Sequence, residues 1–405
     1  MIKIVIGVFA IFIPGAYVLA QQDTTASADS TLLKQIEQQM SPPASGQPAA
    51  QAAQPRSAIS TNPNMSVIGD FQSAYNSLGS RNFDAYLNEA EFSFQSVIDP
   101  YARADFFLSL GKNPSTGKYE ADIEEGYLTT LELPGDLQLK AGKFRMALGR
   151  VNPAHPHALP FIDLPDVYRN YLGEDGLKDE GFSLSWLVPN PLDFYQEFTL
   201  EATDGPVDNP SFTRSTGNRY LYLGHLKNFW DLTPNATLEL GLTGITGPND
   251  SSYSTVIGAI DLTYKWKPLQ FNTYQSFVWQ TEAFFSKAKY RDLPHLSVSY
   301  SFDSTGGTGS LNLNDNYINS WGMYSAITYQ LEKRWFLTGR FDYSNFPFSS
   351  GLAEHSYSAT LGWYATEFQK IEIEGKITSS NFQDQFQQAW LRWIFVIGAH
   401  GAHQY

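Results

Sequence analysis

Polar and apolar residues alternate along much of this chain, and this alternation limits the folds open to it. In residues 371–377, isoleucine and glycine alternate with Glu372, Glu374 and Lys376. Residues 89–95 alternate glutamate, serine and glutamine with alanine and phenylalanine in the same way. Successive side chains of a β-strand point to opposite faces, so the period of two predicts strands with one apolar and one polar face.

Sixteen segments fit this pattern, and we predict a strand in each of them. The predicted strands cover residues 65–76, 86–98, 101–112, 118–132, 136–149, 179–188, 193–203, 218–229, 235–246, 253–266, 273–289, 317–331, 334–344, 354–366, 369–379 and 386–397.

The connections at one end of the predicted strands are short, and the long connections all lie at the other end. Every even-numbered connection is short: residues 99–100, 133–135, 189–191, 231–234, 267–271, 332–333 and 367–368. The long connections are all odd-numbered: residues 150–178, 204–217, 290–316 and 345–353. Short turns on one side and long loops on the other are typical of transmembrane barrels. A soluble β-sandwich does not require its long connections to lie at one end. We therefore predict an all-β fold, a transmembrane antiparallel β-barrel of about 16 strands.

The first twenty residues are predicted to be a cleavable Sec-type signal peptide. Lys3 precedes an apolar run at residues 4–13, which Pro14 and Gly15 interrupt, and residues 18–20 offer a cleavage site. A transmembrane helix needs about 20 apolar residues, and this run is shorter. No other long apolar run occurs, so a chain of this kind spans a membrane only as a barrel.

The rest of the chain divides into two parts. Residues 21–63 are rich in Gln, Ala, Ser, Pro and Thr, which predicts a low-complexity periplasmic linker. Within it, residues 30–40 place apolar side chains on one helical face. This segment forms either a transient short helix or the start of a coiled coil that assists oligomer assembly. Residues 64–405 are the predicted barrel domain.

Composition excludes several classes of protein. The chain has no cysteine, which rules out disulfides, thiolate metal sites and a lipoprotein anchor. Its formal net charge of -14 argues against a nucleic-acid partner, which favours a basic surface. Aromatic residues make up 15% of the chain, in agreement with the aromatic girdles of membrane barrels.

The connection at residues 150–178 is the first candidate functional segment. A long loop at this place in a barrel can fold inward and narrow the pore, and loops of this length are usually functional. The candidate constriction residues are Arg150, His155, His157, Asp163, Asp166 and Arg169.

The two histidines of this loop also allow a metal site. Imidazole and carboxylate groups suit zinc, and Asp163 and Asp166 follow nearby. The alternative is that the prolines shape the loop and His155 and His157 form local hydrogen bonds, which we favour because no third ligand can be assigned. His400 and His403 are predicted on the opposite, periplasmic side.

Charged residues on the polar face of the strands are the second candidate set. Charge along a pore sets its ion preference, and ten of the thirteen residues are acidic, which predicts a preference for cations. The alternative is that they pair across strands and only hydrate the wall. The set consists of Glu89, Glu91, Arg103, Asp105, Asp122, Glu124, Glu239, Glu282, Arg340, Asp342, Glu372, Glu374 and Lys376.

Residues 136–190 carry a resemblance to a known family. The stretch KFRMALGRVNPAHPHALPFIDLPDVYRNYLGEDGLKDEGFSLSWLVP and the ending IFVIGAHGAHQY resemble a phosphate-selective-porin-like group of bacterial outer-membrane barrels. Members of this group are often labelled zinc-regulated or TonB-dependent outer-membrane receptors. The resemblance implies a Gram-negative outer-membrane location and a porin-like barrel.

Three classes of function remain open at this stage. The first is a porin-like channel for passive diffusion of small solutes or ions, with membrane lipid and solutes as its partners and no cofactor. A homotrimer is common among porins of this size. The second is a non-conducting structural, adhesive or metal-uptake barrel. The third is a barrel-embedded lipase. For this class His225 lies on a predicted strand without an evident serine partner, and the G-x-S-x-G and H-E-x-x-H motifs do not occur. We therefore expect no enzymatic activity.

Overall fold

The computed structural model describes residues 63–78, 82–112, 117–207, 209–215, 217–249, 253–268, 274–289 and 317–398. The predicted signal peptide, the helix at residues 30–40, and His400 and His403 lie outside the described residues, as does the linker except for residue 63. They remain predictions. Among the described residues, no helix is long and apolar enough to cross a membrane.

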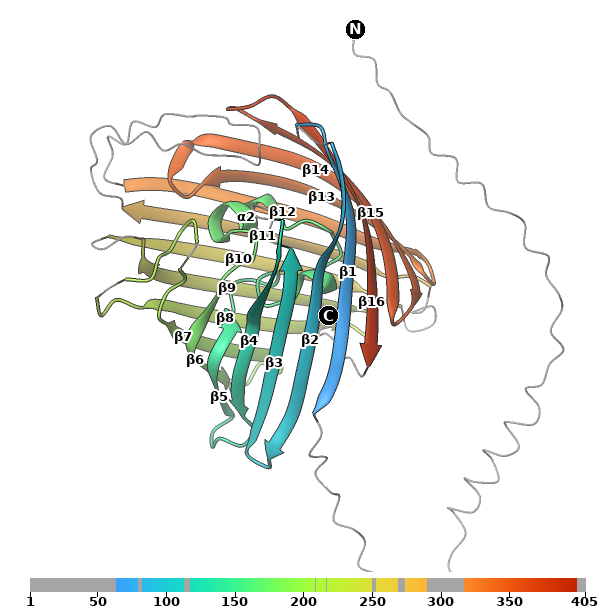
Figure 1. The fold of residues 1–405 in the computed structure, drawn as a ribbon. Coiled ribbons are helices and arrows are strands. Elements are labelled where there is room, and N and C mark those ends of the chain that lie inside the picture. Colours follow the sequence, from blue (N-terminus) through green and yellow to red (C-terminus); the bar gives the residue numbers. More distant parts are fainter. Residues whose placement is uncertain are drawn as a thin grey trace, which may run out of the picture. The chain divides into compact units, whose positions relative to one another are not determined.

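Sixteen strands form one closed barrel, as the alternation predicts (Figure 1). Each strand pairs antiparallel with its neighbour in sequence, and the barrel closes where β1 pairs with β16. The strands are β1 (Asn64–Asn76), β2 (Phe83–Asp99), β3 (Ala102–Lys112), β4 (Tyr119–Thr130), β5 (Leu137–Arg145), β6 (Lys178–Leu187), β7 (Tyr195–Thr203), β8 (Leu221–Thr233), β9 (Ala236–Pro248), β10 (Ser254–Trp266), β11 (Phe277–Lys289), β12 (Tyr317–Glu332), β13 (Trp335–Phe346), β14 (Ser349–Thr366), β15 (Gln369–Ser380) and β16 (Phe386–Gly398).

Several connections differ from the predicted ones; the strand predicted over residues 136–149, for example, ends at Arg145. The predicted long loop at residues 345–353 is wrong: β13 continues to Phe346 and β14 begins at Ser349, so only two residues connect them. Residues 345–351 are rich in Asn, Pro, Ser and Gly, which favours a loop, but Asn345 pairs with Ala353 and the hairpin continues through this segment. The connection between β10 and β11 is longer than predicted, since β11 begins at Phe277.

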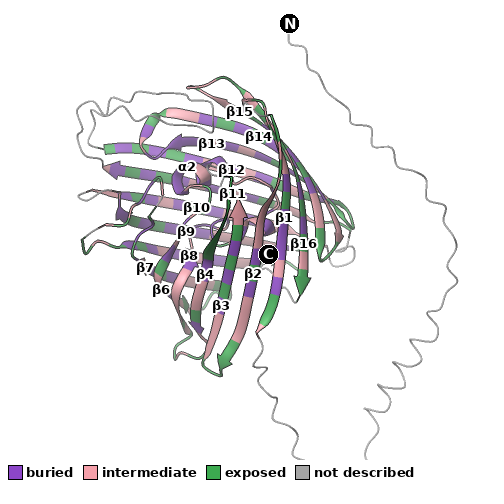
Figure 2. Cartoon of the chain, in the orientation of Figure 1, coloured by how far each residue is buried: buried purple, intermediate pink, exposed green. Residues whose placement is uncertain are grey.

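The two faces of the barrel wall have opposite polarity (Figure 2). On β15, Glu372, Glu374 and Lys376 are buried, whereas Ile373 and Ile377 are exposed. The same alternation runs along the neighbouring strands, whose exposed positions are mostly apolar. This is the inverse of a soluble protein, and it places the polar face inside the barrel.

The connection between β5 and β6, residues 146–177, lies inside the barrel (Figure 1). It contains a 3-10 turn η1 (Pro156–Ala158) and a short helix α2 (Asp166–Leu172). Pro165 precedes the helix, and Gly173, with φ of 86°, ends it in a conformation that glycine adopts without strain. Apolar residues of this segment join inward-facing residues of β8 to β12 in one buried core. We call residues 146–177 the inward loop.

A bulge in β4 changes which residues face inward. The β3–β4 register shifts between Phe107 and Leu108, so that Phe107 pairs with Glu125 and Leu108 with Ile123. A bulge adds one residue to a strand and so changes the alternation beyond it. As a result Glu125 belongs to the inward row, a position that a strict period of two does not assign to it.

Candidate functional site

The inward loop is bound to the barrel wall by buried hydrogen bonds and ion pairs around most of the circumference. One group of contacts centres on Glu282 of β11. Its carboxylate accepts hydrogen bonds from the Tyr168 hydroxyl, from the Tyr324 hydroxyl at 2.5 Å and from the Arg150 backbone N–H at 3.1 Å. The Arg150 guanidinium pairs with Glu239 of β9 at 2.8 Å. The start of the loop is therefore attached to β9 and β11.

The middle of the inward loop is attached to β13 and β15 by a second group of contacts. Lys376 pairs with Asp163 and with Asp166, each at 2.6 Å, and Arg340 pairs with Asp163 at 2.7 Å. Asp342 of β13 accepts the Asp166 backbone N–H at 3.1 Å. Because the side chains of Lys376 and Arg340 are fully buried, their charges are balanced by the loop rather than by solvent.

These ion pairs control the ionisation of the loop carboxyls. Burial opposes their charged forms, but the positive charges of Arg340 and Lys376 outweigh it and hold the pKa of Asp163 far below its usual range. Burial acts in the same way on Asp166, whose pKa is lowered by Lys376 and Arg169. Both groups are therefore ionised at neutral pH and remain so in moderate acid.

Arg392 of β16 attaches the part of the loop around η1. Its guanidinium donates to the backbone carbonyls of Pro156, Leu159 and Phe161 at 3.1–3.3 Å, and it pairs with Glu372 at 2.6 Å. A guanidinium presents several donors in a fixed plane, which suits three carbonyls and a carboxylate at once. Arg392 thus satisfies backbone carbonyls around η1, of which that of Pro156 also accepts the Leu159 N–H.

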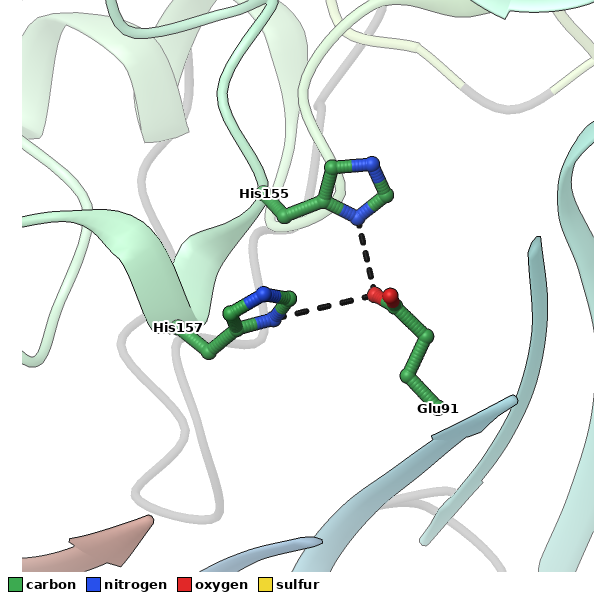
Figure 3. Close-up of side chains that lie close together, drawn as sticks. All are labelled: Glu91, His155 and His157. Carbon is green, nitrogen blue, oxygen red and sulfur yellow. Dashed lines mark hydrogen bonds and ion pairs between the residues drawn. The ribbon is translucent and has the colours of Figure 1, made fainter. Parts of the chain in front are cut away.

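His155 connects the loop to β2 and β4 (Figure 3). Its Nδ1 lies 2.8 Å from Glu91 Oε2, and its Nε2 lies 2.9 Å from Glu125 Oε1. Burial favours the neutral ring, but the hydrogen bonds with Glu125 and Glu91 outweigh it and raise the pKa of His155 to about 9. At neutral pH the ring is therefore protonated and donates to both carboxylates.

His157 lies beside His155 and approaches the same carboxylate of Glu91 (Figure 3). Its Nδ1 is 3.7 Å from Glu91 Oε2, and one ligand atom from each of Glu91, His155 and His157 falls within 4.8 Å of the others (Figure 3). All three residues are buried. Among the described residues, this is the group of histidine and carboxylate side chains that could hold a metal ion.

The structure separates residues that the sequence places together. Asp163 and Asp166 do not join the histidines, because Arg340 and Lys376 bind them. The alternative of local hydrogen bonds is wrong for His155, whose partners Glu91 and Glu125 are 64 and 30 residues away.

The thirteen strand residues fall into two groups. Those covered by the inward loop are almost inaccessible: Glu91, Glu282, Arg340, Asp342, Glu372, Glu374 and Lys376. The other six strand residues are not covered by the inward loop in this way. Arg103 pairs with buried Asp105 at 2.7 Å, and Asp122 is half exposed beside Lys143 and Lys178. Glu124 pairs with Arg145 at 2.8 Å, and Glu239 pairs with Arg150. Glu89, on β2, is partly exposed.

Several residues of the site were missed by the sequence analysis. Arg145, Glu201, Asp261, Glu354 and Arg392 all lie on inward rows and are buried. Except for Arg145, which ends its strand, and Glu354, which His355 follows, each is a single charged residue with apolar or small residues on both sides, as in residues 391–393, Leu-Arg-Trp. That local pattern is the signal that would have identified them.

The histidine considered for a lipase faces the interior. His225 is buried on β8, and its Nδ1 lies 2.8 Å from Thr243 Oγ1. A lipase at the membrane surface would need its histidine on the outside. Among the described residues a second histidine also lies on a strand: His355 on β14, where it is exposed.

Comparisons with known proteins match this geometry at the level of fold. No family model matches the chain. An uncharacterised protein of Aquifex aeolicus strain VF5 is 25% identical over 354 residues, which cover 79% of this chain and 70% of the relative. Outer-membrane OmpT of Vibrio cholerae has a TM-score of 0.52 at 7% identity and covers 82% of this chain and 97% of its own.

Two further solved structures resemble the chain to the same degree. The outer-membrane channel DcaP of Acinetobacter baumannii has a TM-score of 0.52 at 9% identity, with 82% of this chain and 96% of that chain covered. An anion-selective porin from Comamonas acidovorans has a TM-score of 0.51 at 10% identity, with 82% and 98% covered. The fold is that of the porin-like outer-membrane barrels. At these identities the likeness concerns the fold alone, and the phosphate-selective-porin-like group stays a prediction.

Proposed function

We propose that this protein is a porin-like channel of the Gram-negative outer membrane, through which small solutes or ions diffuse passively. The observation that carries the proposal is the inward loop, which occupies the interior of a closed barrel while the outside of that barrel is apolar. A sixteen-stranded barrel without such a loop leaves an aqueous channel. A loop attached to its inner wall restricts that channel.

The outer surface supports a membrane location. Outward-facing aromatic residues lie near both ends of the barrel, as in the girdles that face lipid headgroups. On the side of the short turns they include Trp186, Trp279, Tyr329 and Trp335; on the side of the long loops they include Tyr75, Phe83, Tyr119, Tyr222, Tyr317 and Trp321. Between them, exposed leucine and isoleucine residues such as Leu108, Ile260, Leu337 and Ile373 form the apolar band.

The inward loop would act as a fixed constriction rather than as a gate. Its charged residues are paired with different parts of the wall, with Arg150 at β9 and Asp163 at β13 and β15. A solute would pass beside the loop and meet the charges that remain accessible, among them Asp122 and Glu89. Because acidic residues predominate on the wall, we propose a preference for cations.

One observation favours a second candidate, a non-conducting barrel. Apolar side chains of the loop, including Phe161, Tyr168 and Leu172, pack into a continuous core with Phe284 and Tyr324 of the wall. A core of this kind fills space from which water and ions are excluded. If the loop fills the whole cross-section, the barrel is closed and its role is structural or adhesive.

Conductance in a planar bilayer tests the two candidates. Refolded full-length protein is compared with a variant that lacks residues 153–175, and with a control that lacks residues 382–384 in the connection between β15 and β16. The channel proposal expects a small ohmic conductance for the full chain and for the control, and a larger one for the loop deletion. Conductance only after the loop deletion would favour the closed barrel, and no conductance in any of the three would reject the channel.

The reversal potential under a salt gradient tests the charge preference in the same bilayers. Cation preference should give a potential of the sign set by the cation gradient, and replacing Asp122 by Asn should reduce it. A potential of the opposite sign would reject the proposed preference and leave the channel in place. The homotrimer remains a prediction, which the mass of the detergent-solubilised protein would check.

A further inference from the structure

Glu91, His155 and His157 bring two imidazoles and one carboxylate to a single buried point between β2 and the inward loop (Figure 3). Two histidines and one carboxylate form a known ligand set of zinc sites that keep a fourth position for water or a substrate. The two histidines come from the turn η1 and the residue before it, whereas the glutamate comes from the wall. A metal ion here would therefore join the loop to the barrel.

The spacing of the donor atoms suits a tetrahedral ion. With bonds of about 2.0–2.1 Å, ligand atoms in a tetrahedral zinc site lie about 3.3 Å apart. The distances to Glu91 Oε2 are 2.8 Å from His155 Nδ1 and 3.7 Å from His157 Nδ1, on either side of that value. All three ligand atoms lie within 4.8 Å of one another, so side-chain rotation would have to close the widest pair around the ion.

One oxygen of Glu91 has no hydrogen-bond partner among the described residues. Glu91 Oε1 is buried and accepts no hydrogen bond from any described residue. The side chain of Glu91 is 3% exposed, so solvent cannot easily compensate for this. A buried carboxylate oxygen without a donor is costly, and a cation bound by the carboxylate would remove that cost.

Glu125 supplies the outer contact that metal-binding histidines usually have. Its Oε1 lies 2.9 Å from His155 Nε2, and its Oε2 accepts the Arg145 backbone N–H at 3.0 Å. A histidine that binds metal through one nitrogen commonly donates its other N–H to a carboxylate, which fixes the ring. The orientation of His155 leaves Nδ1 directed at Glu91 and His157, where the ion would lie.

We propose that Glu91, His155 and His157 bind one divalent transition-metal ion, with zinc as the best chemical match. Binding replaces the proton between His155 Nδ1 and Glu91 with the metal, and the proton leaves to solvent. Two carboxylates, Glu91 and Glu125, then face a doubly charged ion, and their two negative charges balance it. The ion would fasten η1 to β2 and strengthen the attachment of the inward loop.

Zinc binding to the refolded full-length barrel in detergent tests this site. Bound zinc per chain is measured after gel filtration, and the dissociation constant is measured by competition with a chromophoric chelator. We expect one tightly held zinc ion per chain at pH 7.5. His157→Ala and Glu91→Gln should weaken binding about 100-fold or more, since loss of an outer-shell partner alone costs about 10–100-fold.

Other histidines serve as controls. His225→Ala, and a His400→Ala/His403→Ala double variant, should each retain the tight ion, because neither removes a proposed ligand. Glu125→Gln should bind zinc with an intermediate affinity, about 10–100-fold weaker than the unchanged chain. Circular dichroism confirms that each variant keeps its strand content.

Three results would overturn the proposal. The first is that the unmodified protein binds less than one zinc ion per chain. The second is that His157→Ala binds zinc as tightly as the unmodified protein. The third is that the His400→Ala/His403→Ala double variant loses the ion. The last would place the zinc at His400 and His403 instead. Because the readout is metal content, these outcomes are independent of whether the barrel conducts.

Discussion

Lys376 on β15 and Asp163 in the inward loop form an ion pair of 2.6 Å although 213 positions separate them in the chain. The Lys376 side chain is fully buried and that of Asp163 is 12% exposed. Lys376 also binds Asp166 at the same distance. One lysine therefore holds two carboxylates of the loop against the wall, in a place where neither charge can be hydrated.

Replacing Lys376 by Met should release the middle of the inward loop. The substitution keeps the length of the side chain but leaves Asp163 and Asp166 with less positive charge nearby. Removing one partner of a buried pair typically costs about 3–5 kcal/mol, and we expect a loss of that size in the free energy of unfolding, measured in urea. Lys267→Met, at an exposed turn position, is the control and should change little. Equal stability of the two variants would contradict the assigned role of Lys376.

The inward loop should stay attached from neutral pH down to about pH 4 and loosen below it. The folded-state pKa of Asp163 is lowered, through Arg340 and Lys376 acting against burial, from its ordinary value of 3.8. A group with a depressed pKa contributes stability above its unfolded pKa, and this is lost as the pH falls through the folded one. Hydrogen exchange of residues 146–177, corrected for intrinsic rates, should therefore be constant from pH 7 to 4 and rise below that. A rise between pH 7 and 5 would rule out control by this carboxyl.

Gly149→Ala should destabilise the protein more than Gly135→Ala does. Both glycines have left-handed backbones, with φ of 61° and 77°, so an alanine at either position is strained by about 1–2 kcal/mol. A Cβ at Gly149 would also overlap Glu282 Oε2 and the Tyr168 hydroxyl, whereas a Cβ at Gly135 would have open space.

Glu282 cannot easily move away, since several donors hold it. Overpacking of this kind costs about 1–3 kcal/mol more. Urea unfolding of the two variants checks the difference between Gly149 and Gly135, and equal losses would show that the carboxylate yields.

Tyr168→Phe should lower stability without changing the shape of the loop. The Tyr168 hydroxyl donates to Glu282, which is fully buried, and its removal leaves the carboxylate with one donor fewer. An unsatisfied buried group costs about 1–3 kcal/mol. Thermal unfolding should show the loss, while Tyr357→Phe on the exposed outer face should leave the midpoint unchanged. A similar midpoint for both variants would count against the Glu282 contact.

The sequence predicts the barrel closely because its signals are local. The alternation of residues 371–377 needs only neighbouring residues to establish a strand, and the short turn at Glu367 and Phe368 reverses the chain whatever surrounds it. The local signals fail where pairing with another strand decides the outcome. The hairpin that extends β13 to Phe346 and the bulge that turns Glu125 inward both depend on the partner strand.

Three members of the histidine cluster were predictable, but Glu125 and the contacts between them were not. His155 and His157 stand out in the sequence, and so does Glu91 on its strand. The three side chains come together because the inward loop crosses the barrel interior and places η1 beside β2. The sequence does not predict that path.

What the sequence determines by itself is the number of strands, the side on which each connection lies and the inward row wherever a strand has no bulge, because all three follow from a period of two and from turn residues. What only the tertiary structure decides is which inward charges the loop covers. Lys376 meets Asp163, and Glu91 meets His155, because closure of the barrel brings strands from both ends of the chain around one loop. The pairing of buried charges that are far apart in the chain depends on that closure, so local sequence patterns cannot predict which charges pair.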